Sequence, residues 1–184
     1  MRPALGKTAQ AGIEIAVIVR VASWRTAVPG AAALCRRAAR AALDRATARG
    51  GAGWGKRLRA RGGELCIVLA SDAFVAKLNR DYRGKTEPTN VLSFRAGTDE
   101  TPQGAYPLGD VVIAFETTRR EAKAAGKTLA HHLAHLVVHG VLHLVGHDHE
   151  KEKDAARMEG LEIEILRGLG ISDPYRETKS AEVA

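Results

Sequence analysis

The sequence predicts an α+β fold, or a closely related α/β layer built on a mixed sheet, rather than a strict doubly wound fold. Helical and strand-like segments alternate irregularly, and some neighbouring strands have no helix between them. The chain has 184 residues, of which 45% are hydrophobic. It can therefore bury one proper core, and a second full domain has no room.

Four segments have the alternating pattern or the β-branched composition that is typical of strands. They span residues 13–19, 64–70, 89–94 and 108–115. The first reads IEIAVIV, and the second, ELCIVLA, follows a break at Gly62 and Gly63. Together they predict a sheet of four strands.

Five segments carry apolar residues at helical spacing or the residues that mark helix ends. They cover residues 29–48, 72–82, 116–125, 128–146 and 150–169. Ser71 is suited to cap the second helix, Thr128 opens the fourth, and Gly126 ends the third. The arginines of the first helix are expected to face solvent, with a nucleic-acid contact as the other interpretation.

The two ends of the chain are polar or irregular. Residues 1–12 are expected to form a flexible N-terminal tail and residues 172–184 a flexible C-terminal tail, on either side of a domain of residues 13–171. No stretch approaches the roughly 20 apolar residues that a membrane-spanning helix needs. The apolar run after the N-terminal tail is short and interrupted by Glu14, which argues against a signal peptide.

Charge and cysteine content narrow the class of partner and the compartment. Lys and Arg outnumber Asp and Glu by 28 to 21, which gives a net charge of +7 and favours phosphate-rich or anionic-membrane partners over acidic proteins. Cys35 and Cys66 belong to no CxxC pair or disulfide-dense pattern, so we expect buried thiols in a reducing compartment. A cytoplasmic protein that does not contact the membrane is predicted.

The densest group of chemically active residues is HGVLHLVGHDH, residues 139–149. His135, His139 and His143 recur every four residues, so they share one face of a helix. His149 would lie far around an uninterrupted helix. Gly146 resolves this, because glycine readily adopts the left-handed conformation that ends a helix and turns the chain back.

The resulting spacing, HxxxHxxGxxH, is the frame in which metzincin proteases hold zinc. We predict that His139, His143 and His149 bind one Zn²⁺ ion, with the fourth position open as in catalytic sites. His135 is expected to support the ligands or to pack, with a fourth ligand as the alternative. His147 is expected not to bind the metal, and Asp148 either orients a ligand or is a turn residue.

Position 140 separates this chain from the zinc proteases. In the zincin frame the residue after the first histidine is the glutamate that acts as general base, and here it is Gly140. Glycine cannot accept a proton, which disfavours peptide hydrolysis by that route. We expect Gly140 to let a neighbouring element pack closely.

A second polar group lies in YRGKTEPTNVLSF, residues 82–94, where Arg83 and Lys85 stand close together. The planar guanidinium of an arginine suits a phosphate. The segments LNRDYRGKTEPTNVLSF, LGDVVIA and HLVVHGVLHLVGHDH resemble, in order, the signature blocks of the YbeY family of bacterial metal-dependent endoribonucleases. The similarity spans residues 13–169.

This resemblance implies a compact α+β fold in which helices pack on a central mixed sheet. It also implies binding to the small ribosomal subunit and cleavage of single-stranded RNA in ribosomal RNA maturation, including 3′-end processing of 16S rRNA. By position, the zinc ligands of the family fall on His139, His143 and His149, and its functionally important arginine falls on Arg83. The chain departs from the family at His147, where tyrosine is usual, and at Arg95, where proline is usual. We expect Arg95 to alter its loop without touching a ligand.

The hypothesis from the sequence is that zinc polarises a water molecule or the RNA 2′-hydroxyl for attack on phosphorus. Arg83 is expected to act as a catalytic residue and Lys85 to bind the substrate, both by neutralising charge on the phosphoryl oxygens. Two other interpretations stay open. The protein could be a non-catalytic ribosome-assembly factor stabilised by zinc, or a zincin-like protease.

Overall fold

A four-stranded sheet forms the centre of the computed structural model, which describes residues 12–48, 54–97, 104–149 and 151–176. The strands are β1 (Ile13–Val19), β2 (Gly63–Ala70), β3 (Val91–Arg95) and β4 (Tyr106–Ala114), in the order β1-β2-β4-β3. β1, β2 and β4 run parallel, and β3 pairs antiparallel with β4. The mixed sheet and the single α+β domain predicted from the sequence are confirmed.

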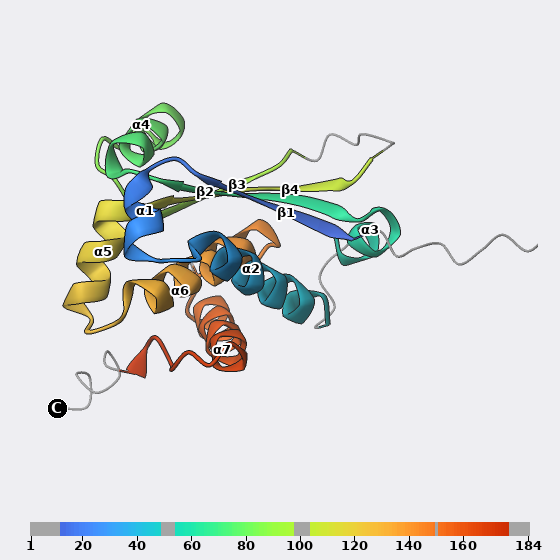
Figure 1. The fold of residues 1–184 in the computed structure, drawn as a ribbon. Helices are drawn as coiled ribbons and strands as arrows, with labels where there is room; N and C mark the ends of the chain where they lie inside the picture. The colour runs from blue at the N-terminus through green and yellow to red at the C-terminus, as the bar shows by residue number, and fades with distance from the viewer. Residues whose placement is uncertain (1–11, 49–53, 98–103, 150, 177–184) are drawn as a thin grey trace, which may run out of the picture.

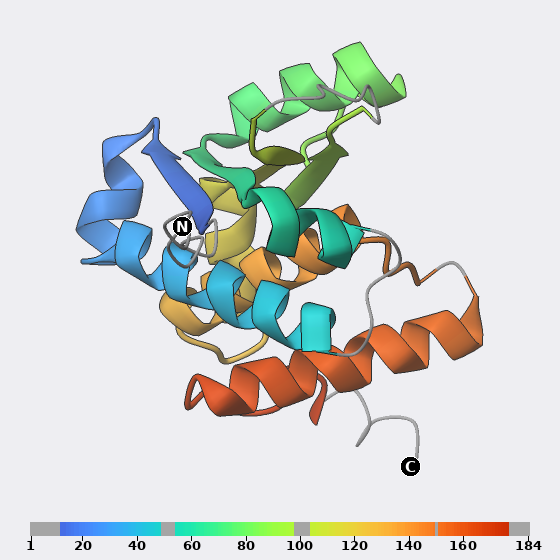
Figure 2. The same ribbon diagram turned by 90° about the vertical axis from the view of Figure 1, so that its right-hand side faces the viewer.

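Helices cover the two faces of this sheet unequally. The helices are α1 (Ala22–Ala27), α2 (Ala31–Ala48), α3 (Trp54–Arg61), α4 (Asp72–Arg83), α5 (Phe115–Ala124), α6 (Leu129–Leu144) and α7 (Glu152–Gly168). In Figure 1, α4 lies above the sheet, whereas α2, α6 and α7 lie below it. Figure 2 shows α7 running beneath α2 and α6, so α6 lies between the sheet and α7.

The central position of α6 follows from its sequence. Its first turn is capped by Thr128, whose hydroxyl accepts a hydrogen bond from the backbone N–H of His131 at 3.1 Å. Apolar side chains surround most of the helix, which packs on β3, β4, α2, α5 and α7. Leu133, Val137 and Leu142 are fully buried. Each large apolar side chain buried in this way contributes roughly 1.5–3 kcal/mol, so the histidine-bearing helix is firmly anchored.

The last helix and the residues after it pack against α6. The apolar stripe predicted for α7 is confirmed, because Met158, Leu161 and Leu166 are buried. The predicted C-terminal tail begins at residue 172. The carbonyl of Pro174 in this segment accepts a hydrogen bond from Lys127 Nζ, shortly before α6, at 2.6 Å. Residues 1–11 and 177–184 of the predicted tails lie outside the described residues.

Two short helices were not expected from the sequence. α1 is held by Trp24, which is fully buried and whose indole N–H donates to the Ala70 carbonyl at 3.1 Å. α3 is strongly basic but buries Trp54 and Leu58 against the core. Both helices depend on tertiary contacts that a local pattern of residues does not reveal.

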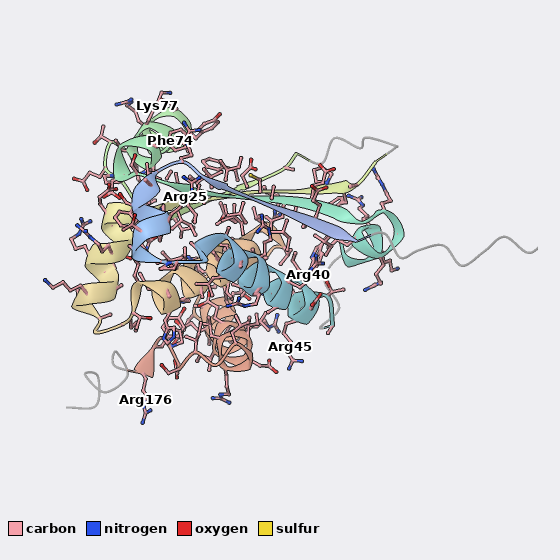
Figure 3. The ribbon with its side chains drawn as sticks, viewed as in Figure 1. Arg25, Arg40, Arg45, Phe74, Lys77 and Arg176 are labelled. Atoms are coloured by element: carbon pink, nitrogen blue, oxygen red, sulfur yellow. The ribbon has the colours of Figure 1, made fainter. Side chains whose placement is uncertain are left out.

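The arginines of α2 bond to the protein itself as well as facing solvent. Arg36 Nε donates to the Ile15 carbonyl at 3.2 Å, and Arg40 donates to the Ile13 carbonyl at 2.5 Å. Figure 3 shows Arg40 and Arg45 on α2. These bonds tie α2 to the edge strand β1, whose free carbonyl groups would otherwise be open to pairing. Within the part of the chain that the structure describes, none of the helices combines the length and apolarity needed to cross a bilayer.

Candidate metal centre

The three predicted ligands meet at the C-terminal end of α6. His139 and His143 come from the helix itself, and His149 from the segment that follows it. One ring nitrogen from each of the three side chains lies within 4.8 Å of the others. The ring centroids are 4.5 Å apart for His139 and His143, 4.9 Å for His143 and His149, and 5.6 Å for His139 and His149.

The turn after α6 brings His149 back, as the sequence predicts. Gly146 has a φ of 93°, a conformation that side chains rarely adopt. Its N–H donates to the His143 carbonyl at 3.1 Å, and the N–H of His147 donates to the Leu142 carbonyl at 3.0 Å. This pair of bonds is a Schellman motif, which ends the helix and satisfies two of its last carbonyl groups. The predicted role of Gly146 is confirmed.

Two other histidines of α6 turn toward carboxylates. His132 Nε2 lies 2.9 Å from an oxygen of Glu121, and His135 Nε2 lies 2.9 Å from Glu162 Oε2. His135 therefore has the supporting position that the sequence favoured, rather than that of a fourth ligand. The cluster of possible metal-binding groups found among the described residues contains neither of these histidines, nor His147.

A buried glutamate lies behind the first ligand. Glu162 of α7 is fully buried, and its Oε1 lies 2.8 Å from His139 Nδ1. Burial opposes ionisation of Glu162, but hydrogen bonds from His135 and His139 outweigh it and lower the pKa to about 2. Glu162 is thus a carboxylate at neutral pH and accepts the Nδ1–H of His139.

The electrostatic surroundings keep His143 neutral. Burial, followed by the nearby rings of His139 and His149, lowers the pKa of His143 to about 4. Only the neutral imidazole carries a lone pair that can bind a cation. At physiological pH the ring of His143 is therefore in the form that a metal ligand requires.

The donor set fits a zinc ion. His139 Nε2 and His143 Nε2 face each other at 3.1 Å. Zn–N bonds of about 2.0–2.1 Å in a tetrahedron put two nitrogens about 3.3 Å apart, close to this separation. Because Glu162 accepts the hydrogen bond of the His139 Nδ1–H group, the lone pair of that ring is on Nε2 and faces the other two histidines.

The cluster opens into a cleft of about 660 Å³ between the end of α6 and the start of β3. Besides the three histidines, the cleft is lined by Thr89, Asn90, Val91, Ser93, Arg95, Leu144 and Asp148. Asp148 accepts the backbone N–H of His149 through Oδ1 at 2.7 Å, which is the turn role left open by the sequence. The lining is mostly polar and can accommodate a charged substrate beside the histidines.

Arg95 contradicts the expectation that it touches no ligand. Its guanidinium donates to the backbone carbonyl of His143 at 2.9 Å. That carbonyl lies in the last turn of α6, where the negative end of the helix dipole favours a cation. Arg95 therefore links β3 to the ligand helix and adds a positive charge to the cleft.

The structure gives Gly140 the packing role expected of it. A Cβ atom at this position would lie 2.6 Å from Val111 Cγ1 and 3.1 Å from Ser93 Oγ. The Ser93 hydroxyl also donates to the Gly140 carbonyl at 3.1 Å. The helix can approach the sheet this closely only because residue 140 has no side chain, so the position where zinc proteases carry glutamate faces β4 and β3.

Arg83 and Lys85 lie at the other end of the segment that leads into the cleft. Arg83 is the last residue of α4, and its side chain lies outside what the structure describes. Lys85 is exposed, and its backbone N–H donates to the Asn79 carbonyl at 3.3 Å. Lys85 is not among the described residues that line the cleft. Their predicted roles toward a substrate stay predictions.

The sequence interpretation missed Glu162 and Tyr175. One signal was present, because Glu162 stands four residues after Met158 and three before Ile165, on the apolar stripe of α7. A charged residue on a buried face needs a partner, and the nearest helix carries the histidines. Nothing in the local sequence around Tyr175 indicates that its hydroxyl donates to Glu162.

Fold and site together define a class: an α+β protein with an open three-histidine centre at the end of a buried helix. Comparison with known proteins places it more narrowly. The family described as "Endoribonuclease YbeY" matches residues 35–170, which is most of the chain. The chain belongs to this family, and the resemblance recognised in the sequence is confirmed.

Individual relatives agree with this assignment. The protein named "Endoribonuclease YbeY" from Paramagnetospirillum magneticum is 50% identical over 169 residues, covering 90% of this chain and 97% of that protein. The protein of the same name from Parvibaculum lavamentivorans is 48% identical over 184 residues, covering 95% of this chain and 91% of its own. A solution structure from Thermotoga maritima has a TM-score of 0.51 at 18% identity, covering 91% of this chain and 93% of that one, and it supports the fold.

Proposed function

We propose that this protein is a metal-dependent endoribonuclease of ribosomal RNA maturation. The observation that carries the proposal is the convergence of His139, His143 and His149 beside an open polar cleft, in a chain that belongs to the endoribonuclease YbeY family. The substrate proposed is single-stranded RNA, including the 3′ end of 16S rRNA. The small ribosomal subunit is its proposed partner, the cytoplasm its place of action, and one Zn²⁺ ion its cofactor.

The chemistry of the residues supports zinc as the ion. Imidazole nitrogens suit zinc and other late transition ions, whereas magnesium and calcium prefer oxygen ligands. The three histidines would hold the ion and leave one position free for a substrate or water. When bound, zinc supplies Lewis-acid charge beside the scissile phosphate and lowers the pKa of a water molecule.

The other groups of the cleft are suited to a phosphate backbone. Arg95 contributes a cation, and Thr89, Asn90 and Ser93 contribute polar side chains. Arg83 is proposed to neutralise charge that grows on the phosphoryl oxygens, and Lys85 to bind the RNA nearby. The net charge of +7 supports association with a polyanion.

Substitution of Arg83 tests the catalytic part of this proposal. Arg83→Ala should leave zinc content unchanged and reduce cleavage of a single-stranded RNA by about 100-fold or more, as removal of a charge-stabilising donor does in other enzymes. Arg80→Ala is a matched control, because Arg80 belongs to the same helix and its side chain is exposed beside Asp81. Cleavage by Arg83→Ala at the wild-type rate would contradict the role of Arg83.

Metal removal separates the enzyme from a non-catalytic assembly factor. Purified protein should cleave RNA when loaded with zinc and lose that activity after chelation, in preparations checked for contaminating nucleases. A protein that binds zinc and remains inactive on RNA in both states would favour the assembly factor. The zincin-like protease is disfavoured by Gly140, and zinc-loaded protein should leave casein intact.

A further inference from the structure

Glu162 is the only charged side chain that is buried among the residues the structure describes. It projects from α7 toward α6, and both of its oxygens accept hydrogen bonds. Oε1 accepts from His139 Nδ1 at 2.8 Å, and Oε2 accepts from His135 Nε2 at 2.9 Å and from the Tyr175 hydroxyl. A buried charge is costly unless it is bonded in this way, so the arrangement implies a specific role.

The bond to His139 fixes which nitrogen of that ring carries the proton. A neutral imidazole has one N–H, and a carboxylate can only accept, so the proton is held on Nδ1. The lone pair is then on Nε2, the atom that lies 3.1 Å from His143 Nε2. In the other tautomer an N–H would point into the space where the three rings converge.

Among the described residues, neither of the other two rings of the cluster has a carboxylate partner of this kind, and the ring of His143 instead has a hydrogen bond with the backbone of His147. Among the described residues, Glu162 is the only carboxylate that bonds to a ring nitrogen of His139, His143 or His149. Asp148 contacts the backbone N–H of His149. The buried negative charge is therefore concentrated behind one ligand.

We propose that Glu162 is the positioning residue of the metal centre, and that it acts by holding His139 in the Nδ1–H tautomer with its Nε2 directed at the ion. Tyr175, from the segment after α7, completes the hydrogen bonding of the carboxylate and holds it in place. The proposal rests on the proposed function, because it requires that His139 binds a metal. It adds that affinity for the metal depends on a residue that does not touch the ion.

A packing role for Glu162 predicts a different result from a positioning role. If the carboxylate only joined α6 to α7, its loss would lower the stability of the whole fold without a specific effect on the metal. A positioning residue affects the affinity and the ligand geometry of the ion even where the fold is intact. Loss of such a partner behind a ligand typically lowers metal affinity by about 10–100-fold.

Cobalt titration of three variants distinguishes these roles. Co²⁺ serves as the probe, because its visible absorption reports the coordination geometry. Glu162→Gln should bind Co²⁺ about 10–100-fold more weakly than wild type, with an altered spectrum. Tyr175→Phe keeps the bond to His139 and should show a smaller loss. Glu164→Gln is the control, because Glu164 pairs with Arg45 of α2 from the same helix, and it should bind as wild type does.

Glu162→Gln with wild-type affinity and spectrum would overturn the positioning role while leaving the metal centre intact. Wild-type protein that binds no Co²⁺ through its histidines would overturn the proposed function as well. A measurement on the intact protein covers the case in which Glu162→Gln does not fold. Nitrogen-15 NMR of the zinc-loaded wild type should show His139 protonated at Nδ1, and protonation at Nε2 with zinc on Nδ1 would contradict the proposal.

Discussion

The two halves of α6 carry the same residue type with different surroundings. In the first half, His132 and His135 each direct Nε2 at a carboxylate, of Glu121 and Glu162 respectively. At the end of the helix, His139 and His143 direct their Nε2 atoms at each other, 3.1 Å apart. Helical periodicity alone puts His135, His139 and His143 on one face and cannot tell the halves apart.

The partner of each ring nitrogen makes the difference. A carboxylate that accepts from Nε2 occupies the atom that would bind a metal, as it does at His135. A carboxylate that accepts from Nδ1 leaves Nε2 free, as at His139. Glu162 does both at once, with one oxygen for each histidine, so a single side chain separates supporting histidine from predicted ligand.

The largest effect is expected from removal of one ring of the cluster. His143→Ala should lower zinc affinity by more than about 100-fold, since loss of a mere supporting group already costs about 10–100-fold. RNA cleavage should be lost with the metal. His132→Ala, which removes a histidine from the other half of the helix, should bind zinc as wild type does. Calorimetric titration measures the zinc affinity of both variants. Equal affinities for His143→Ala and His132→Ala would show that the two halves of the helix do not differ in metal binding.

The turn that returns His149 is the next most sensitive feature. Gly146→Ala places a side chain at a φ of 93°, which costs roughly 1–3 kcal/mol of stability. Zinc affinity should fall as well, because His149 moves relative to the other two rings. Gly160→Ala is the matched control: its Cβ would meet nothing within 4 Å, and alanine favours the helix by about 0.5–1 kcal/mol. Urea unfolding and zinc titration of both variants test this, and a neutral Gly146→Ala would show that the turn is not required.

The contact between α6 and the sheet should show an effect of similar size on stability. Gly140→Ala brings a methyl group within 2.6 Å of Val111 Cγ1 and should destabilise the fold by about 1–3 kcal/mol. The double variant with Val111→Ala should recover part of the loss from crowding. Chemical denaturation gives the free energy of unfolding of each variant. If the changes caused by the two substitutions are additive, the close approach of helix and sheet is not the reason why residue 140 is glycine.

The smallest effect is expected at Arg95. Arg95→Ala removes the hydrogen bond to the His143 carbonyl. Because the bond is exposed, its contribution to stability should be at most about 1.5 kcal/mol. Weaker RNA binding with nearly unchanged zinc affinity should follow from the lost cation. Fluorescence anisotropy with a labelled single-stranded RNA checks this. Undiminished binding would show that Arg95 does not contribute to RNA binding.

The sequence predicts the fold well where a pattern is local. Residues 13–19 alternate and form β1, and the caps at Ser71 and Thr128 are present because each hydroxyl accepts the expected backbone N–H. α1 and α3 escaped prediction because Trp24 and Trp54 stabilise them through contacts distant in the sequence. Local propensity is too weak to indicate such short helices.

In the candidate site, too, the features set by a local pattern could be predicted and those set by distant contacts could not. The spacing of the histidines and the glycine before the third made the cluster predictable from a short segment. Glu162 and Tyr175 could not be assigned in the same way, because they reach the cluster from α7 and the segment after it, over 23 residues or more. Arg95 was misjudged for a related reason: its contact to the His143 carbonyl joins residues 48 apart in the chain.

The most direct test of the central claim is the position of the metal in zinc-loaded protein. A crystal structure with anomalous scattering measured at the zinc edge should show one peak, bound by one nitrogen each of His139, His143 and His149. The Nδ1 of His139 should still donate to Glu162. A peak bound by His131, His132 or His135, or no zinc among the three converging rings, would contradict the account.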